Sequence, residues 1–214
     1  RNCGNGLRCV AKYVYDRGMI NRTHFSIETL GGNVQVEVHP GPDGKVSQVT
    51  VDMGRPRFER RALPMTGDPD STAIDEELTV GGQTYRLTAV SMGNPHAVFF
   101  VPDVDSIPIA ELGPEIERSP LFPERVNVEF VRVLNRRELA FRVWERGSGI
   151  TLACGTGACA AVAAGVVNRL LDPDVPVTVH LPGGDLDIVW KSQSNIYMKG
   201  PAEWVMDGEW LGGL

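Results

Sequence analysis

The chain has 214 residues, of which 42% are hydrophobic and 22% charged, and its formal net charge is −6. This composition is typical of a globular protein with one large domain or two small ones, and the negative charge argues against a nucleic-acid partner. No apolar run is long enough to span a bilayer, so we expect no membrane association.

The first 54 residues predict one helix and three strands. Apolar residues at helical spacing follow Cys3 and predict a helix that ends near Gly18. Residues 25–38 alternate apolar and polar side chains around a Gly-Gly pair at 31–32, a pattern typical of a β-hairpin. A third strand is predicted at 46–54.

The middle of the chain predicts a linker and then four strands. Residues 55–82 are polar and rich in Pro and Asp, as expected of a linker that leads into the edge of a second domain. Alternating or continuously apolar segments follow. The predicted strands are 83–92, 96–101, 125–134 and 138–146.

The last third repeats the pattern of the first 54 residues. A small, apolar helix follows Cys154 and ends before Pro173, and because it is apolar nearly all round we expect it to be buried on every side. A hairpin at 177–190 and a strand at 195–200 come next. Matching features of the two copies lie 151 or 152 residues apart, which indicates an internal duplication.

The duplication predicts an α+β fold with two pseudo-symmetric domains, each a curved, mostly antiparallel sheet wrapped around a central helix. We expect residues 1–54 plus 201–214 to form the first domain, with the terminal segment returning as a closing strand. The second domain is expected to comprise residues 55–200. Each domain would direct the N-terminus of its helix toward a common cleft.

The first copy lacks counterparts of the strands that precede Cys154. Only two residues come before its motif, and the chain does not begin with Met. We therefore expect the chain to be a fragment whose missing N-terminal segment resembles residues 83–153, with its first domain incomplete. A native mass of 23.3 kDa would contradict this expectation.

The four cysteines are too few for a disulfide scaffold, and no histidine follows them at zinc-ligand spacing. We expect reduced thiols, no metal and a cytoplasmic location. Cys9 and Cys159, farther along their helices, are interpreted as core thiols. The other two, Cys3 and Cys154, each occupy a Cys-Gly-polar-Gly turn at a helix start.

A helix N-terminus offers unpaired N–H groups and the positive end of the helix dipole, so it can bind a carboxylate and favour a thiolate. One such turn is a weak signal, because a small buried cysteine at a tight turn explains it better. Two symmetry-related turns can place thiols on opposite faces of one carbon. One thiol would remove a proton and the other would deliver one, which inverts the stereocentre without a cofactor.

Five stretches carry a resemblance to the diaminopimelate epimerase family: NCGNGLRCVA, MGNPHAVFFV, VNVEF, WERGSG and ACGTGACAA. They spread over almost the whole chain in the family order. The resemblance implies a cofactor-independent isomerase that interconverts LL- and meso-diaminopimelate, acts on a small amino-acid substrate and forms a homodimer. It also implies that Cys3 and Cys154 are the catalytic pair.

The resemblance assigns the remaining site residues by motif. The family also uses asparagines upstream of its first motif, which this chain does not contain. His96 and Glu145 would tune the cysteine pair, and Arg146 would make a bidentate pair with the distal carboxylate. The implied substrate-binding residues are Gly4, Asn5, Asn94, Asn127, Glu145, Arg146, Gly155 and Thr156.

Two alternative functions stay open from the sequence. The first is another racemase or epimerase of the same superfamily, although proline racemases usually carry His at the position of Asn5 and lack MGNPH. The second is a non-catalytic amino-acid-binding protein in which the cysteines are structural. Fast iodoacetamide labelling that substrate prevents would favour catalysis over binding.

Overall fold

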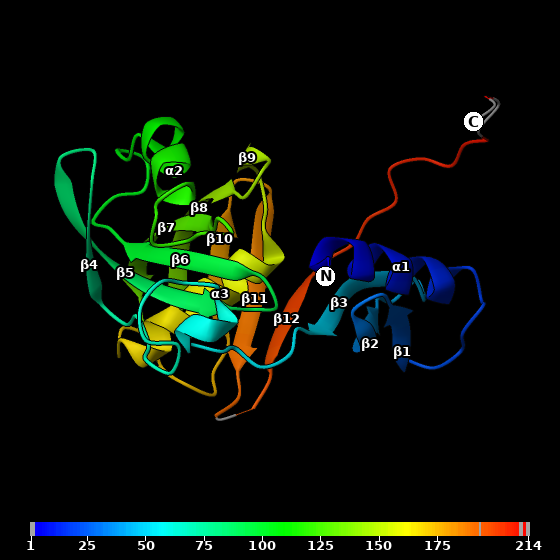
Figure 1. The fold of residues 1–214 in the computed structure, drawn as a ribbon. Coiled ribbons are helices and arrows are strands. Elements are labelled where there is room, and N and C mark those ends of the chain that lie inside the picture. The colour runs from blue at the N-terminus through cyan, green and yellow to red at the C-terminus, as the bar shows by residue number, and fades with distance from the viewer. Residues whose placement is uncertain (1–2, 193, 210–211, 213–214) are drawn as a thin grey trace.

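The computed structural model describes residues 3–192, 194–209 and 212. Within that part of the chain, three α-helices, one short 3₁₀ turn and twelve strands follow one another (Figure 1). Their bounds are α1 Gly4–Asp16, β1 His24–Thr29, β2 Gly32–Pro40, β3 Val46–Asp52, η1 Arg60–Ala62, β4 Glu76–Val80, β5 Gln83–Ser91, β6 Pro95–Phe100, α2 Ile109–Glu117, β7 Asn127–Asn135, β8 Glu138–Glu145, β9 Gly149–Thr151, α3 Gly155–Val167, β10 Val177–Leu181, β11 Gly184–Trp190 and β12 Ile196–Pro201.

The described strands form one continuous sheet in the order β1-β2-β3-β12-β11-β10-β8-β7-β6-β5-β4, with β9 added to β8. Two neighbouring pairs are parallel, β6 with β7 and β10 with β8, and the others are antiparallel. Strand β12 joins the two halves, because it pairs with β3 on one side and with β11 on the other (Figure 1). The unit α1-β1-β2-β3 recurs as α3-β10-β11-β12, which matches the predicted repeat.

Helix α3 is buried over most of its length, as its apolar sequence predicts. Its residues from Gly157 to Gly165 have little or no exposed surface. They pack in one hydrophobic cluster with the strands of the repeat and with the inner side of α1. The N-terminal end of α3 is thereby fixed by packing on all sides.

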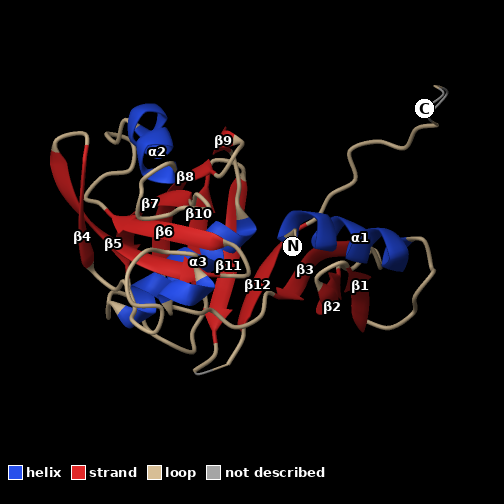
Figure 2. Ribbon diagram, in the orientation of Figure 1, coloured by secondary structure: helices blue, strands red, loops and turns tan. Residues whose placement is uncertain are grey.

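Strand β6, the second half of β5 and the first half of β7 are buried on both faces, which explains their runs of apolar residues. Alternate residues such as Val98 and Val131 face the cluster around α3. Their neighbours Phe99 and Phe130 face a second cluster that includes residues of α2. Figure 2 shows α2 beside the sheet, on the side away from α3. The sequence did not predict α2, whose stretch contains Gly113 and Pro114.

Two expectations about α1 and the hairpins need correction, and a third, about the C-terminal segment, follows below. Cys9 is exposed, because strands β1 to β3 cover the side of α1 that carries Leu7 and Ala11 and leave the side of Cys9 open. The hairpin turns lie one residue earlier than predicted, since Gly32 and Gly184 already begin strands.

The segment after Pro201 forms no closing strand in its described residues, 202–209 and 212. It runs irregularly past α1, where the Trp204 ring lies 5.8 Å from that of Tyr13. The Arg17 guanidinium lies 4.8 Å from the Trp204 ring. The rest of the predicted strand lies outside the described residues. Among the described helices, none has the length and apolarity needed to cross a membrane.

Candidate active site

Both predicted thiols occupy the N-cap position of a helix. Cys3 precedes α1 and Cys154 precedes α3, each with an extended backbone. The carbonyl oxygen of each accepts the first helical hydrogen bond at 2.9 Å, from Leu7 and Ala158 respectively. The two thiols therefore lie where free backbone N–H groups and the positive helix dipole are concentrated.

The glycines that follow the two cysteines both pack against the side chain of Met198. A Cβ atom on Gly4 would lie 2.5 Å from Cε of Met198, and one on Gly155 would lie 2.9 Å from Sδ of the same residue. Met198 is fully buried on β12, the strand shared by both halves. The lack of a side chain at Gly4 and Gly155 thus lets both helix N-termini approach the same point.

Cys154 is 5% exposed and is surrounded by polar groups. Its Sγ lies 3.5 Å from the Thr156 hydroxyl and accepts a hydrogen bond from the backbone of Gly157. Burial, followed by the carboxylates of Glu129 and Glu145, raises the pKa of this thiol to about 12, and the two hydrogen bonds only partly offset the rise. In the structure, Cys154 is therefore a thiol at neutral pH.

Cys3 has different surroundings. It is exposed, and its charged neighbour is Arg8, whose side chain is almost fully buried one turn farther along α1. Burial lowers the pKa of Arg8, and the nearby thiols, Cys3 among them, oppose this effect. The Nε of Arg8 donates to the Pro201 carbonyl at 3.0 Å, whereas one terminal nitrogen has no partner among the described residues.

Strand alternation places the polar site residues on the face that α3 covers. His96 lies opposite Asn127 in the β6–β7 register, and Glu129 follows two residues later on the same face. Nδ1 of the fully buried His96 lies 2.6 Å from Oε1 of the fully buried Glu129. Nε2 lies 3.1 Å from Oδ1 of Asn94, whose amide nitrogen donates to Thr156 at 3.3 Å.

Asn127 makes hydrogen bonds to the backbone on both sides. Its amide nitrogen donates to the Pro95 carbonyl at 2.8 Å, and its amide oxygen accepts from the N–H of Arg146 at 2.9 Å. It therefore ties the MGNPH segment to the end of β8. The Arg146 guanidinium donates to the carbonyl of Glu124 at 3.0 Å.

The structure thus brings four of the predicted residues together at Cys154, in contact or through one another: Asn94, His96, Thr156 and Cys154 itself. Glu145, at the end of β8, acts on Cys154 through its charge and accepts a hydrogen bond at 2.5 Å from Thr151. Asn5 belongs to the other helix start. Its amide oxygen is buried, has no partner among the described residues and would lie 3.9 Å from a Cβ on Gly155.

Sequence reasoning missed Glu129, although VNVEF was one of its motifs. The available signal was a charged residue inside a run of five buried strand residues, a position where a carboxylate needs a partner. Met198 and Arg8 were also missed. Met198 looks like any core residue in sequence, whereas Arg8 faces the core side of an amphipathic helix.

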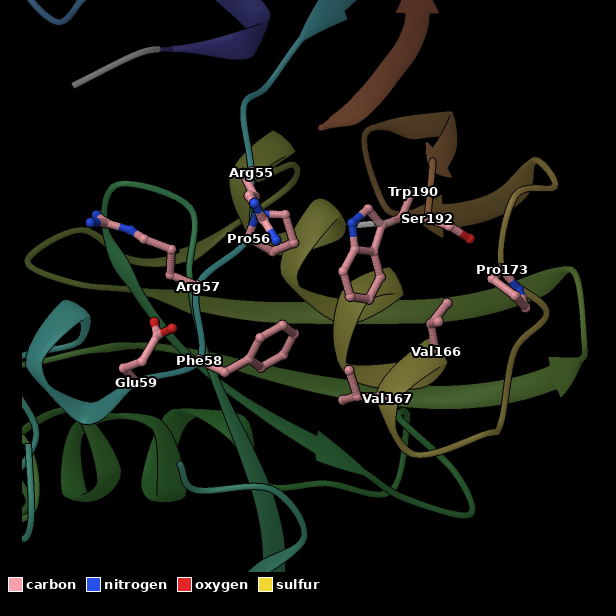
Figure 3. Close-up of a pocket in the computed structure, with 10 residues that line it drawn as sticks. All are labelled: Arg55, Pro56, Arg57, Phe58, Glu59, Val166, Val167, Pro173, Trp190 and Ser192. Carbon is pink, nitrogen blue, oxygen red and sulfur yellow. The ribbon is translucent and has the colours of Figure 1, made fainter. Parts of the chain in front are cut away.

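A separate pocket of about 500 Å³ lies away from these residues (Figure 3). The rings of Phe58 and Trp190 face its interior, beside Val166 and Val167 from the C-terminal part of α3. None of the predicted site residues lines this pocket. Across the described residues, no group of three or more His, Cys, Asp or Glu side chains is arranged to hold a metal ion.

Known proteins resemble the chain over nearly its whole length. A sequence profile of the diaminopimelate epimerase family matches residues 1–59 and 88–205. The diaminopimelate epimerase of Bacillus pumilus is 57% identical over 97% of this chain and 73% of its own length. That of Geobacillus kaustophilus is 55% identical over 97% of this chain and 71% of its own length.

A crystal structure of a probable proline racemase from Agrobacterium radiobacter, with bound carbonate, superposes with a TM-score of 0.70. The alignment covers 96% of this chain and 68% of that protein at 15% sequence identity, so the likeness concerns the fold alone. It confirms the α+β architecture expected from the sequence.

Proposed function

Since the chain belongs to the diaminopimelate epimerase family, we propose that Cys3 and Cys154 are the acid–base pair of a cofactor-independent epimerase. The substrate would be LL- or meso-diaminopimelate, and the reaction would invert one α-carbon. As an isomerase of this family, the protein would act in lysine and peptidoglycan precursor synthesis.

One observation carries the proposal: the two helix starts that bear the thiols meet over Met198. Each cysteine occupies the N-cap position of its helix, and each following glycine lacks the side chain that would separate the helix from Met198. This arrangement suits a planar intermediate held between two proton-transfer groups. A binding protein without chemistry would have no need for a thiol on both helices.

The proposed reaction consists of two proton transfers. One cysteine, as thiolate, accepts the α-proton and becomes a thiol, and the electron pair left on carbon delocalises into the adjacent carboxylate. The other cysteine, as thiol, delivers its proton to the opposite face of the carbon and becomes a thiolate. After turnover the two cysteines have exchanged protonation states, so the enzyme is ready for the reverse reaction.

Backbone N–H groups would stabilise the charge that develops on the carboxylate. The available donors are those of Gly4 and Asn5 at α1 and of Gly155 and Thr156 at α3, because the first turn of a helix leaves its N–H groups unpaired. The positive ends of both helix dipoles would stabilise the same negative charge on the carboxylate. This binding mode requires no positively charged side chain at the reacting carboxylate.

The far end of the substrate would be recognised by side chains from the second half of the chain. We propose that Arg146 pairs with the distal carboxylate and that Glu145 holds an ammonium group. Asn94 would contribute amide hydrogen bonds near the non-reacting stereocentre. Asn127 would support the site without touching the substrate, because its amide already binds the Pro95 carbonyl and the Arg146 N–H.

Proton exchange tests the proposal. The reduced protein is incubated with LL-diaminopimelate in deuterated water, and deuterium at the α-carbon and formation of the meso isomer are followed. We expect Cys3→Ala and Cys154→Ala to lose at least about 100-fold in rate. Cys9→Ala is the matched control, since Cys9 is an exposed thiol of α1 outside the proposed site. Equal rates in all three variants would refute the two-cysteine mechanism.

A further inference from the structure

Glu129 is a buried carboxylate that the proposed mechanism does not use. It lies in the middle of β7, between β6 and β8, and its side chain has no exposed surface. One carboxylate oxygen pairs with His96, and the other has no hydrogen-bond partner among the described residues. A carboxylate left half-satisfied in a protein interior is costly, so a role beyond packing should explain it.

A series of contacts connects this carboxylate with the thiol of Cys154. Nδ1 of His96 lies 2.6 Å from Oε1 of Glu129, and its other nitrogen lies 3.1 Å from the amide oxygen of Asn94. Asn94 donates to the Thr156 hydroxyl, which lies 3.5 Å from Sγ of Cys154. An ionised carboxylate can only accept, so toward that form of Glu129 the imidazole donates from Nδ1.

Glu129 also faces the thiol directly. A Cβ atom on Gly157 would lie 2.8 Å from Oε1 of Glu129 and 3.3 Å from Sγ of Cys154. The two groups therefore face each other across the space that glycine leaves open. The other titratable groups that act on Cys154 are Glu145 from β8 and, within α3, Cys159.

The two thiols consequently differ in their charged neighbours. Cys154 faces two carboxylates, whereas Cys3 has the buried guanidinium of Arg8 as its charged neighbour. We propose that Glu129 is a positioning residue that keeps Cys154 in its thiol form, so that Cys154 serves as the proton donor of the pair. This inference rests on the proposed two-cysteine function.

Electrostatics agrees with this geometry. After burial, the charge of Glu129 is the largest influence that raises the pKa of Cys154, and it exceeds the opposing effect of the Thr156 hydroxyl. Burial raises the pKa of Glu129 itself, and the paired His96 opposes that rise. The contact with His96 thus favours the charged form of the carboxylate, against the larger effect of burial.

Thiol labelling tests the inference without any substrate. The rate of iodoacetamide labelling is measured against pH for each cysteine by peptide mass spectrometry. In Glu129→Gln we expect the Cys154 profile to move to lower pH by about one to two units, for a unit charge roughly 6 Å away at an effective dielectric constant of about 20. Below the midpoint this corresponds to labelling about 10- to 100-fold faster.

Three internal comparisons accompany the variant. The Cys3 profile should not change, Glu129→Asp should stay close to the wild type because it keeps the charge, and Glu138→Gln on the exposed start of β8 should have no effect. A Cys154 profile that is the same in Glu129→Gln and in the wild type overturns the inference. If Glu129→Gln does not fold, the test uses the wild type alone. A labelling midpoint of Cys154 that lies at a pH no higher than the labelling midpoint of Cys3 also overturns the inference.

Kinetics separates this inference from the proposed function. The alkaline limb of the kcat/KM profile reports ionisation of the proton donor, so it should move to lower pH in Glu129→Gln by the same amount as the labelling profile. Both reaction directions should move together, because their ratio is fixed by the equilibrium constant. A labelling shift in a protein that does not epimerise diaminopimelate would refute the proposed function and leave the tuning of Cys154 by Glu129 intact.

Discussion

Replacing Asn127 by alanine should destabilise the protein as well as impair the site. The side chain is 4% exposed and joins the carbonyl of Pro95 to the N–H of Arg146. Its removal leaves two backbone groups without partners, at about 1–3 kcal/mol for each group that stays buried. Arg146 is half-buried, so water can reach part of this space. We expect a loss of about 2–4 kcal/mol in the free energy of unfolding.

Urea denaturation measures this loss, with Asn33→Ala as the matched control. Asn33 lies exposed on β2, so its replacement should change the free energy of unfolding by no more than about 0.5 kcal/mol. A residue that only contacted substrate would raise KM and leave unfolding unchanged. If Asn127→Ala is as stable as Asn33→Ala, the reasoning that assigns Asn127 to the support of the site is wrong.

Two further predictions concern stability. Gly113→Ala should lower the melting temperature although alanine favours helices, because a Cβ there would lie 2.6 Å from the Trp144 ring. The expected loss in the free energy of unfolding is about 1–3 kcal/mol. An unchanged melting temperature would contradict this prediction. Burial acts to raise the pKa of Asp16, but hydrogen bonds from Lys12 and Val46 outweigh it and hold the pKa below its usual value. Such a group stabilises the fold above its unfolded-state pKa, so Asp16→Asn should cost about 1 kcal/mol at pH 7 and progressively less as the pH falls below about 4. Denaturation curves at pH 7 and pH 3 that show the same difference would contradict this assignment.

The repeat was predictable because its signals are local. The helices after Cys3 and Cys154 follow glycine turns and carry apolar residues at helical or continuous spacing, and the hairpins alternate around Gly-Gly pairs. The placement of the two thiols at helix starts follows from these signals. Their convergence on Met198 does not, because it depends on the pairing of β12 with β3, which no local pattern specifies.

Other features were hidden for particular physical reasons. Helix α2 escaped prediction because Gly113 and Pro114 normally interrupt helices, whereas here the glycine makes room for Trp144. Cys9 was expected in the core because free cysteine behaves as a small, usually buried apolar residue, but burial depends on which side of α1 the sheet covers. Glu129 is a charged residue in an otherwise apolar strand, and only the β6–β7 register shows that His96 is its partner.

The position of β12 also determines when the site can form during folding. This strand comes last in the chain, and its register places Tyr197 opposite Asp52. Such a pairing has to close a loop that spans most of the chain, and contacts of this range form slowly. A nascent chain carries both cysteines long before β12 has been synthesised. Until β12 inserts between β3 and β11, the two helix starts have no common Met198 to pack against, so the proposed site can form only after β12 has paired.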